Sequence, residues 1–170
     1  LGIDVFDCGL STTPTVEVMV PKMEADGGII LTASHNPKNW NALKLLNEKG
    51  EFVNGENGAD ILKIAEEDRY SFAEVDDLGK IQLLPGAIEL HIKDVLDLPL
   101  VNKEAIEKAN FKVAVDAVNS TGGISIVPLL KALGVKDIVE LYCEPNGEFP
   151  HNPEPLKEHL GDIMNAVVEH

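Results

Sequence analysis

Cysteine is scarce in this sequence, which contains only Cys8 and Cys143. Two cysteines are too few for a disulfide framework, and both lie in or beside apolar runs. We therefore expect buried thiols in a reducing, cytoplasmic compartment. Long apolar runs are also missing, since none approaches the ~20 residues that a membrane-spanning helix requires.

Basic residues are outnumbered, because 14 Lys and Arg stand against 29 Asp and Glu, for a formal net charge of −15. This excess of negative charge argues against nucleic acid or an anionic membrane as a partner, and it favours solubility. With 44% hydrophobic residues in 170, the chain can bury one or two cores of ordinary size.

One segment lacks acidic residues altogether. No Asp or Glu occurs between Gly27 and Asn47, whereas Lys38 and Lys44 do. The segment holds the apolar run Ile29-Ile30-Leu31, which predicts a buried strand, and then the polar loop Thr32-Ala33-Ser34-His35-Asn36-Pro37. Open α/β sheets bind their ligands at the carboxyl ends of strands. The composition of this loop favours an anion, phosphate in particular, beside its serine.

Each residue of interest also has an ordinary structural interpretation. Ser-His-Asn-Pro is good turn chemistry, so Ser34 could simply belong to a turn. His35 could bond to backbone, and it is disfavoured as a general base for Ser34 because adjacent side chains usually diverge. Lys44 could face solvent, as most lysines do. The segment from Asn119 to Gly123 could cradle a phosphate at a helix N-terminus, but tight packing of strand against helix is the expectation.

The residues from Thr32 to Val53, TASHNPKNWNALKLLNEKGEFV, resemble the active-site serine loop of the α-D-phosphohexomutases, the phosphoglucomutase/phosphomannomutase family. In that family the serine carries a phosphoryl group, which it donates to a hexose phosphate and takes back. Ser34 falls on this serine and His35 on the histidine beside it. Lys44, ten residues after the serine, falls on the active-site lysine.

The resemblance continues downstream. Residues 111–116 and 117–123 are similar to the opening strand and glycine loop of the family's second domain, and residues 144–147 and 151–155 to its later loop. It implies the C-terminal part of domain 1 over residues 1–99 and the N-terminal part of domain 2 over residues 100–170. We therefore expect a piece of a longer enzyme, with the remainder of its own chain as a partner.

Several family features have no counterpart in these residues: the start of domain 1, the Asp-rich D-x-D-x-D-R loop that binds magnesium, the sugar-recognising loop and the distal phosphate-binding loop. The resemblance implies Mg²⁺ as cofactor, with Ser34 contributing through its phosphate and the Asp ligands lying outside this chain. Truncated sheets would expose strand edges near Leu1 and His170, where self-association is expected.

Alternating patterns predict two incomplete three-layer α/β units with mixed, mostly parallel sheets. In the first unit, a helix between the first two strands implies a right-handed parallel crossover. Its expected elements are a strand over 4–8, a helix from the N-cap Thr13 to Gly27-Gly28, a strand over 28–32, a hairpin-like turn at 48–50, and helices over 59–67 and 88–96. Those of the second are a helix over 105–110, a strand over 111–116, a helix over 123–133, a strand over 138–142 and a helix over 156–167.

The activity that the resemblance implies is intramolecular phosphoryl transfer, which interconverts hexose 1-phosphate and hexose 6-phosphate through a phosphoserine at Ser34. In it Lys44 supplies a cation or acts as general acid/base, and His35 donates a hydrogen bond. The 170 residues alone are expected to be inactive. The alternative is a non-catalytic phosphosugar-binding domain on the same scaffold. Such a domain would not need the active-site residues, so it is disfavoured by the presence of Ser34, His35 and Lys44. A serine hydrolase is disfavoured because no G-x-S-x-G elbow occurs.

Overall fold

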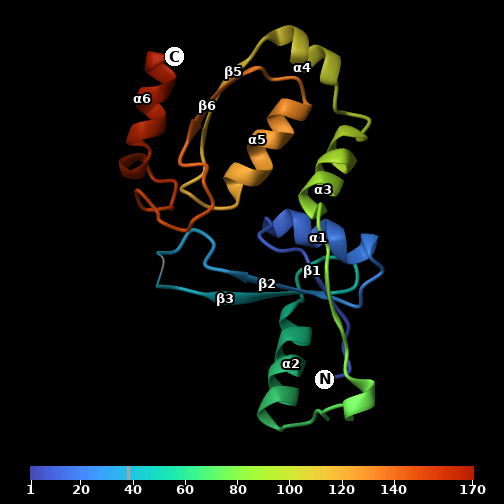
Figure 1. Ribbon diagram of the computed structural model, residues 1–170. Helices are drawn as coiled ribbons and strands as arrows, with labels where there is room; N and C mark the ends of the chain where they lie inside the picture. Colours follow the sequence, from blue (N-terminus) through green and yellow to red (C-terminus); the bar gives the residue numbers. More distant parts are fainter. Residues whose placement is uncertain (38) are drawn as a thin grey trace.

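The computed structural model describes residues 1–37 and 39–170, so Lys38 of the acid-free segment lies outside the described residues. Helices and short strands alternate along the chain in two stacked parts (Figure 1). The first part contains α1, β2, β3 and α2, the second contains α4, β5, α5, β6 and α6, and α3 lies between them. The predicted mixed α/β class is confirmed, and the predicted boundary near residue 100 stays a prediction.

The strands of the first part form two small sheets. β1 (Val5–Asp7) pairs in parallel with β4 (Ile81–Leu83), while β2 (Gly28–Thr32) and β3 (Ala42–Leu46) are antiparallel. The predicted parallel crossover from β1 to β2 is wrong, because these two strands lie in different sheets. Sequence patterns missed β4, since three residues next to a polar stretch are too few to show an alternation.

Helix α1 (Thr13–Lys22) begins one residue earlier than predicted, because its N-cap is Thr12 rather than Thr13, and the Thr12 hydroxyl accepts a hydrogen bond from the Thr15 amide at 3.3 Å. Gly27-Gly28 does not end this helix, contrary to prediction. Glu24 takes a left-handed φ of 52°, and the Ala25 amide donates to the Val20 carbonyl at 3.0 Å. This Schellman arrangement closes the helix earlier, with a non-glycine residue in the left-handed position.

The hairpin-like turn predicted at residues 48–50 is confirmed by an antiparallel bridge between Leu46 and Phe52. Gly50 has a φ of 78°, and a Cβ there would collide with the Glu17 carbonyl of α1. That carbonyl is the one whose usual helical donor is missing, because Pro21 has no amide hydrogen. The turn therefore needs glycine for both its backbone angle and its contact with α1.

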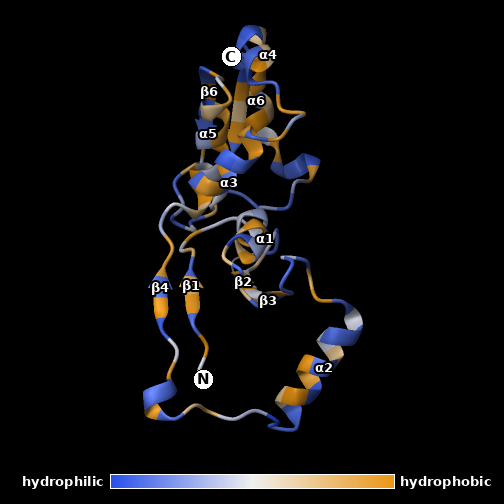
Figure 2. Ribbon diagram, turned by 90° about the vertical axis from the view of Figure 1, so that its right-hand side faces the viewer, coloured by the Kyte–Doolittle hydropathy of each residue, from blue (hydrophilic) through white to orange (hydrophobic). Residues whose placement is uncertain are grey.

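The core beneath α1 is small. Val20, Ile30 and Leu46 are at most 7% exposed and form one cluster, which joins α1 to the β2–β3 sheet. The opposite face of the same sheet carries Ile29 and Leu31, which are 65% and 74% exposed. Strands β1 and β4 also consist largely of apolar residues (Figure 2), and their large apolar side chains are exposed. The first part is therefore packed on one side and leaves much apolar surface open.

Between β3 and the second part the chain forms three helical segments: α2 (Gly55–Glu66), the 3₁₀ turn η1 (Val75–Asp77) and α3 (Ala87–Leu96). Every residue of α2 is partly or fully exposed. It begins before the predicted residue 59, because the Asn54 side chain caps it by accepting from the Asn57 amide at 2.8 Å. In contrast, α3 packs against both α1 and α5 and so links the two parts.

The second part has the predicted strand-helix-strand order. β5 (Lys112–Asp116) and β6 (Asp137–Leu141) are parallel and are joined by α5 (Gly122–Ala132), with α4 (Lys103–Ala109) leading into β5. The predicted last helix is wrong in its first turn, which forms the separate 3₁₀ turn η2 (Lys157–His159) before α6 (Gly161–Glu169) because the backbone leaves helical geometry at Leu160. The sheet lies between α5 and α6 (Figure 1), which makes three layers.

Both cysteines are free and half-buried. Burial raises the pKa of the Cys8 thiol, and Asp7 adds to the effect. Burial also raises the pKa of the Cys143 thiol, with further contributions from Glu140 and Asp116. Both side chains therefore stay in the unreactive thiol form. Among the described residues, no helix combines the length and apolar character needed to cross a bilayer.

Candidate active site

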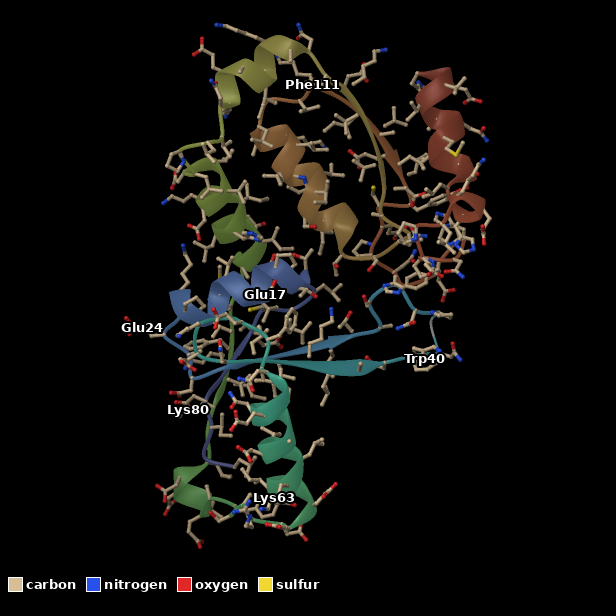
Figure 3. The ribbon with its side chains drawn as sticks, turned by 180° about the vertical axis from the view of Figure 1, so that it is seen from behind. Glu17, Glu24, Trp40, Lys63, Lys80 and Phe111 are labelled. Carbon is tan, nitrogen blue, oxygen red and sulfur yellow. The ribbon has the colours of Figure 1, made fainter. Side chains whose placement is uncertain are left out.

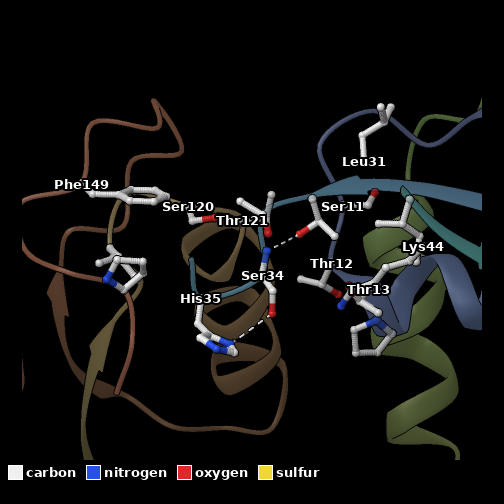
Figure 4. Close-up of a pocket in the computed structure, with 16 residues that line it drawn as sticks. Ser11, Thr12, Thr13, Leu31, Ser34, His35, Lys44, Ser120, Thr121 and Phe149 are labelled. Atoms are coloured by element: carbon white, nitrogen blue, oxygen red, sulfur yellow. Dashed lines mark hydrogen bonds between the residues drawn. The ribbon is translucent and has the colours of Figure 1, made fainter. Parts of the chain in front are cut away.

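An open cleft of about 550 Å³ lies where the two parts meet (Figure 4). Loops that follow β1, β2, β5 and β6 supply its walls, so the cleft occupies the carboxyl ends of strands from both parts. This is the edge at which α/β sheets usually bind ligands. The lining residues are Ser11, Thr12, Thr13, Pro14, Ile30, Leu31, Thr32, Ala33, Ser34, His35, Lys44, Val118, Ser120, Thr121, Phe149 and Pro153.

Ser34 lies in this cleft, two residues beyond the end of β2. Its φ of 56° is left-handed, and its amide donates to the Thr32 hydroxyl at 2.9 Å. The Asn36 amide donates to the Ala33 carbonyl at 3.0 Å, so the serine does belong to a turn. The turn and the functional interpretation are compatible, because the turn presents an exposed hydroxyl to the cleft.

The side chains of Ser34 and His35 converge. The Ser34 Oγ lies 3.3 Å from the His35 Nδ1, at hydrogen-bond distance (Figure 4). The predicted divergence of these neighbours is wrong, because the left-handed backbone at Ser34 changes the direction of its side chain. The imidazole is therefore placed to bind whatever the serine oxygen carries.

Lys44 enters the same cleft from β3, directly opposite Ile30 of β2. It lies on the sheet face that packs against α1 and is half-buried. Its Nζ is 5.7 Å from the centre of the Phe52 ring, a cation–π contact. In the view of Figure 4, Ser34 lies between His35 and Lys44.

The charge of the cleft is one-sided. Among the described residues that line it there is no Asp or Glu, while Lys44 carries a positive charge and His35 a titratable ring. The rest of the polar lining consists of hydroxyls. In a protein of net charge −15, this is a local environment for an anion that also bears hydroxyl groups.

The described residues include no group of three or more His, Cys, Asp or Glu side chains that could hold a metal ion. The cleft itself offers hydroxyls, one amine and one imidazole. Mg²⁺ prefers oxygen ligands and usually binds through carboxylates and phosphates. The residues present do not by themselves fit a Mg²⁺ ion.

Several residues that line the cleft were not predicted as site residues from the sequence. Ser11, Thr12 and Thr13 follow β1 as Ser34 follows β2, so the same argument about polar loops at strand ends would have found them. Phe149 also lines the cleft, but only the tertiary structure places it there, because no local sequence pattern indicates this position. The expected tight packing after β5 is confirmed at Gly123, where a Cβ would collide with the Cys143 carbonyl. Ser120 and Thr121 nevertheless line the cleft.

The hairpin loop that carries Ser34 extends to Trp40, which is 61% exposed. Trp40 lies at the tip of the β2–β3 ribbon, at the opposite end from Glu24 (Figure 3). The Trp40 amide donates to the Pro37 carbonyl at 2.9 Å. A large aromatic side chain is thus presented to solvent beyond the serine.

Comparison with known proteins gives a consistent result. The family model described as phosphoglucomutase/phosphomannomutase, alpha/beta/alpha domain I, matches residues 1–71, and that of alpha/beta/alpha domain II matches residues 89–170. A phosphoglucomutase/phosphomannomutase of Thermococcus kodakarensis is 36% identical over 170 residues, which cover 98% of this chain and 36% of the relative. A probable phosphoglucosamine mutase of Methanobrevibacter smithii is 31% identical over 168 residues, with coverages of 98% and 36%.

A solved structure agrees with this. The crystal structure of a phosphoglucomutase/phosphomannomutase family protein from Burkholderia thailandensis superposes with a TM-score of 0.80 at 25% identity. The match covers 99% of this chain and 36% of that one. The chain thus spans about a third of the length of the proteins that it matches.

Proposed function

The chain belongs to the phosphoglucomutase/phosphomannomutase family, and we propose that it is the phosphoserine-bearing part of an enzyme that interconverts hexose 1-phosphate and hexose 6-phosphate. The observation that carries the proposal is the position of Ser34. Its hydroxyl is exposed in a cleft without acidic lining residues, together with His35 and Lys44.

In the proposed reaction, a hydroxyl of the bound sugar phosphate attacks the phosphorus on Ser34. The bond between phosphorus and Oγ breaks, a bond to the sugar oxygen forms, and the hydroxyl proton leaves to a base. The second half repeats this in reverse from the other phosphate of the sugar, so that Ser34 regains its phosphoryl group. Such transfer depends mainly on positioning and on electrostatic stabilisation.

Charge compensation falls to the side chains around the serine. A phosphoserine carries about −1.5 to −2 charges at neutral pH and must meet a second anion. Lys44 supplies positive charge in the cleft and is the group that we propose for proton exchange with the sugar hydroxyl. The Nδ1 of His35 lies 3.3 Å from the Ser34 Oγ, and we propose that this ring donates a hydrogen bond to the phosphoryl group on the serine.

Mg²⁺ is the cofactor that we propose for the whole enzyme, with carboxylate ligands from outside these 170 residues. From this chain, a phosphate oxygen on Ser34 would be its ligand. We propose a cytoplasmic enzyme, in keeping with two free, half-buried thiols of raised pKa.

The test uses the full-length protein that contains this chain. Its mass is measured intact and after proteolysis, and its turnover is measured with glucose, mannose and glucosamine 1-phosphates. Ser34→Ala should lose both the phosphate and most of the turnover. Ser71→Ala is the matched control, because Ser71 is also an exposed serine but does not line the cleft.

Near-normal turnover in Ser34→Ala would refute the mutase assignment. Tight binding of hexose phosphate without turnover in the unaltered protein would favour the non-catalytic phosphosugar-binding domain.

A further inference from the structure

A second cluster of polar side chains lies outside the cleft, at the carboxyl ends of β5 and β6. Asp116 ends β5, and its Oδ2 is 2.9 Å from the Nε2 of His151. The Asp116 side chain is 8% exposed and that of His151 20%. The two residues are 35 positions apart, so their contact fixes a long connection rather than a local turn.

Both ring nitrogens of His151 face acceptors. The Nε2 faces the Asp116 carboxylate, and the Nδ1 lies 2.9 Å from the Asn152 carbonyl oxygen. A carbonyl and an ionised carboxylate can only accept, whereas a neutral imidazole can donate from only one nitrogen. The geometry is therefore satisfied by the doubly protonated imidazolium form of His151.

The Asp116 carboxylate joins two segments that line the cleft. Its Oδ1 accepts from the Val118 amide at 3.0 Å, and Val118 is itself a cleft residue. Its Oδ2 holds His151, which lies between the cleft residues Phe149 and Pro153. One carboxylate thus fixes the start of the α5 loop and the loop after β6 together.

Other groups around His151 come from the residue that follows β6 and from α6. The Tyr142 ring meets the imidazole edge to face at 5.8 Å, and the Tyr142 hydroxyl donates to Asp162 at 2.7 Å. That hydrogen bond is the main cause that raises the pKa of Tyr142, so its hydroxyl stays protonated. The charged and titratable groups that face His151 are therefore Asp116, Asp162 and the neutral Tyr142 phenol.

We propose that the Asp116–His151 ion pair is a positioning element of the phosphotransfer site. While His151 is protonated, the pair holds the Phe149–Pro153 segment in place as a wall of the cleft that contains Ser34, and deprotonation of His151 loosens this wall. The proposal rests on the proposed function. Asp116 and His151 act through the loop, because the cleft is lined by their neighbours and not by these two side chains.

The electrostatics of the pair agree with its geometry. Partial burial by itself lowers the pKa of His151. The hydrogen bonds to the Asn152 carbonyl and Asp116, together with the charges of Asp116 and Asp162, outweigh burial and raise the pKa above 6.5. The pair is therefore favoured by the folded structure and is lost as pH rises through the raised pKa of His151.

Four variants of the full-length protein test the proposal. His151→Gln and Asp116→Asn remove the ion pair with little change in size, and His151→Lys restores a cation that titrates far higher. His159→Gln is the matched control. His159 is another half-buried histidine of the second part, it bonds to the Glu154 carbonyl at 2.8 Å, and it does not line the cleft.

The first readout does not depend on activity. Amide exchange of peptides covering residues 147–153, corrected for the intrinsic pH effect, should show protection in the unaltered protein that falls as pH rises above 6.5. His151→Gln and Asp116→Asn should show low protection at every pH, and His159→Gln should match the unaltered protein. Equal protection in the unaltered protein and His151→Gln would overturn the proposal.

The second readout is kinetic. We expect kcat/KM for hexose 1-phosphate to fall by about 10-fold to 10²-fold in His151→Gln, with partial recovery in His151→Lys and an unchanged phosphate on Ser34. Lost protection with unchanged kcat/KM would refute the positioning role. Absence of turnover in the unaltered protein would refute the proposed function instead, and the exchange measurement would still decide whether the pair holds the wall.

Discussion

Lys44 lies directly opposite Ile30 in the antiparallel β2–β3 ladder, where Thr32 and Ala42 form the last pair. Ser34 is two residues beyond Thr32, and Lys44 is two residues beyond Ala42. The ten-residue spacing of serine and lysine is therefore set by a hairpin, which brings the amine back to the strand that carries the serine. Even-numbered residues of both strands share the face toward α1, so the lysine arrives on the side of buried Ile30.

Lys44→Ala should lower mutase turnover by roughly 10² to 10⁴, the range typical of an acid/base residue. Phosphate on Ser34 should remain detectable by intact mass, because the serine loop itself is unchanged. Lys49→Ala is the control, since Lys49 is an exposed lysine in the next turn of the same hairpin. Equal kinetics in the two variants would make Lys44 an ordinary surface lysine.

Gly50→Ala should destabilise the protein. The left-handed angle costs an alanine about 1–2 kcal/mol, and the collision with the Glu17 carbonyl adds about 1–3 kcal/mol of overpacking. Urea unfolding followed by circular dichroism measures the change.

The comparison is Gly58→Ala in α2, where a Cβ meets nothing within 4 Å. This change should stabilise the helix by about 1 kcal/mol. Similar unfolding midpoints for the two variants would show that the Gly50 contact does not constrain the turn.

Thr15 is fully buried, and its hydroxyl lies 2.8 Å from the Thr12 hydroxyl and 3.1 Å from the Nδ1 of His91. Thr15→Val keeps the shape but removes both bonds, which should cost about 1–3 kcal/mol of unfolding free energy. Thr15→Ser keeps the hydroxyl and should lose only about 1 kcal/mol for the missing methyl. A larger loss in Thr15→Ser than in Thr15→Val would show that packing, rather than hydrogen bonding, joins α1 to α3.

The stability of the protein should depend on pH through His151. Its folded pKa is raised, so the folded state binds this proton more tightly than the unfolded chain does. The contribution is complete below pH 6.5 and is lost as pH rises through the folded pKa. The difference in unfolding free energy between the unaltered protein and His151→Gln should therefore shrink with rising pH. A difference that grew with pH would contradict the assigned ion pair.

Local patterns predicted most elements, because helical periodicity and apolar runs are properties of neighbouring residues. The pairing of Val5 with Ile81 was not predicted, since nothing within either three-residue strand identifies its partner. The end of α1 was misplaced for a related reason. Gly27 is the better residue for a helix stop, but the left-handed Glu24 and the hydrogen bond from the Ala25 amide to the Val20 carbonyl end the helix at Lys22.

The candidate site divides in the same way. Ser34 and Lys44 were found through a local anomaly of charge and a family resemblance, and both line one cleft. Phe149, Asp116 and His151 are distant in sequence from Ser34, and only the fold brings them to the same region. The approach of His35 to Ser34 depends on one backbone angle that residue type does not reveal.

That angle has a consequence for laboratory evolution. Glycine adopts a φ of 56° without strain, whereas the same left-handed backbone conformation costs a serine roughly 1–2 kcal/mol of folding free energy. A library sorted only for folded yield or heat resistance should therefore enrich Ser34→Gly, which removes the hydroxyl that the proposed phosphoryl transfer uses. Selection for stability favours glycine at position 34, whereas the proposed activity needs serine there. Stabilised variants of the protein should therefore also be screened for retention of Ser34.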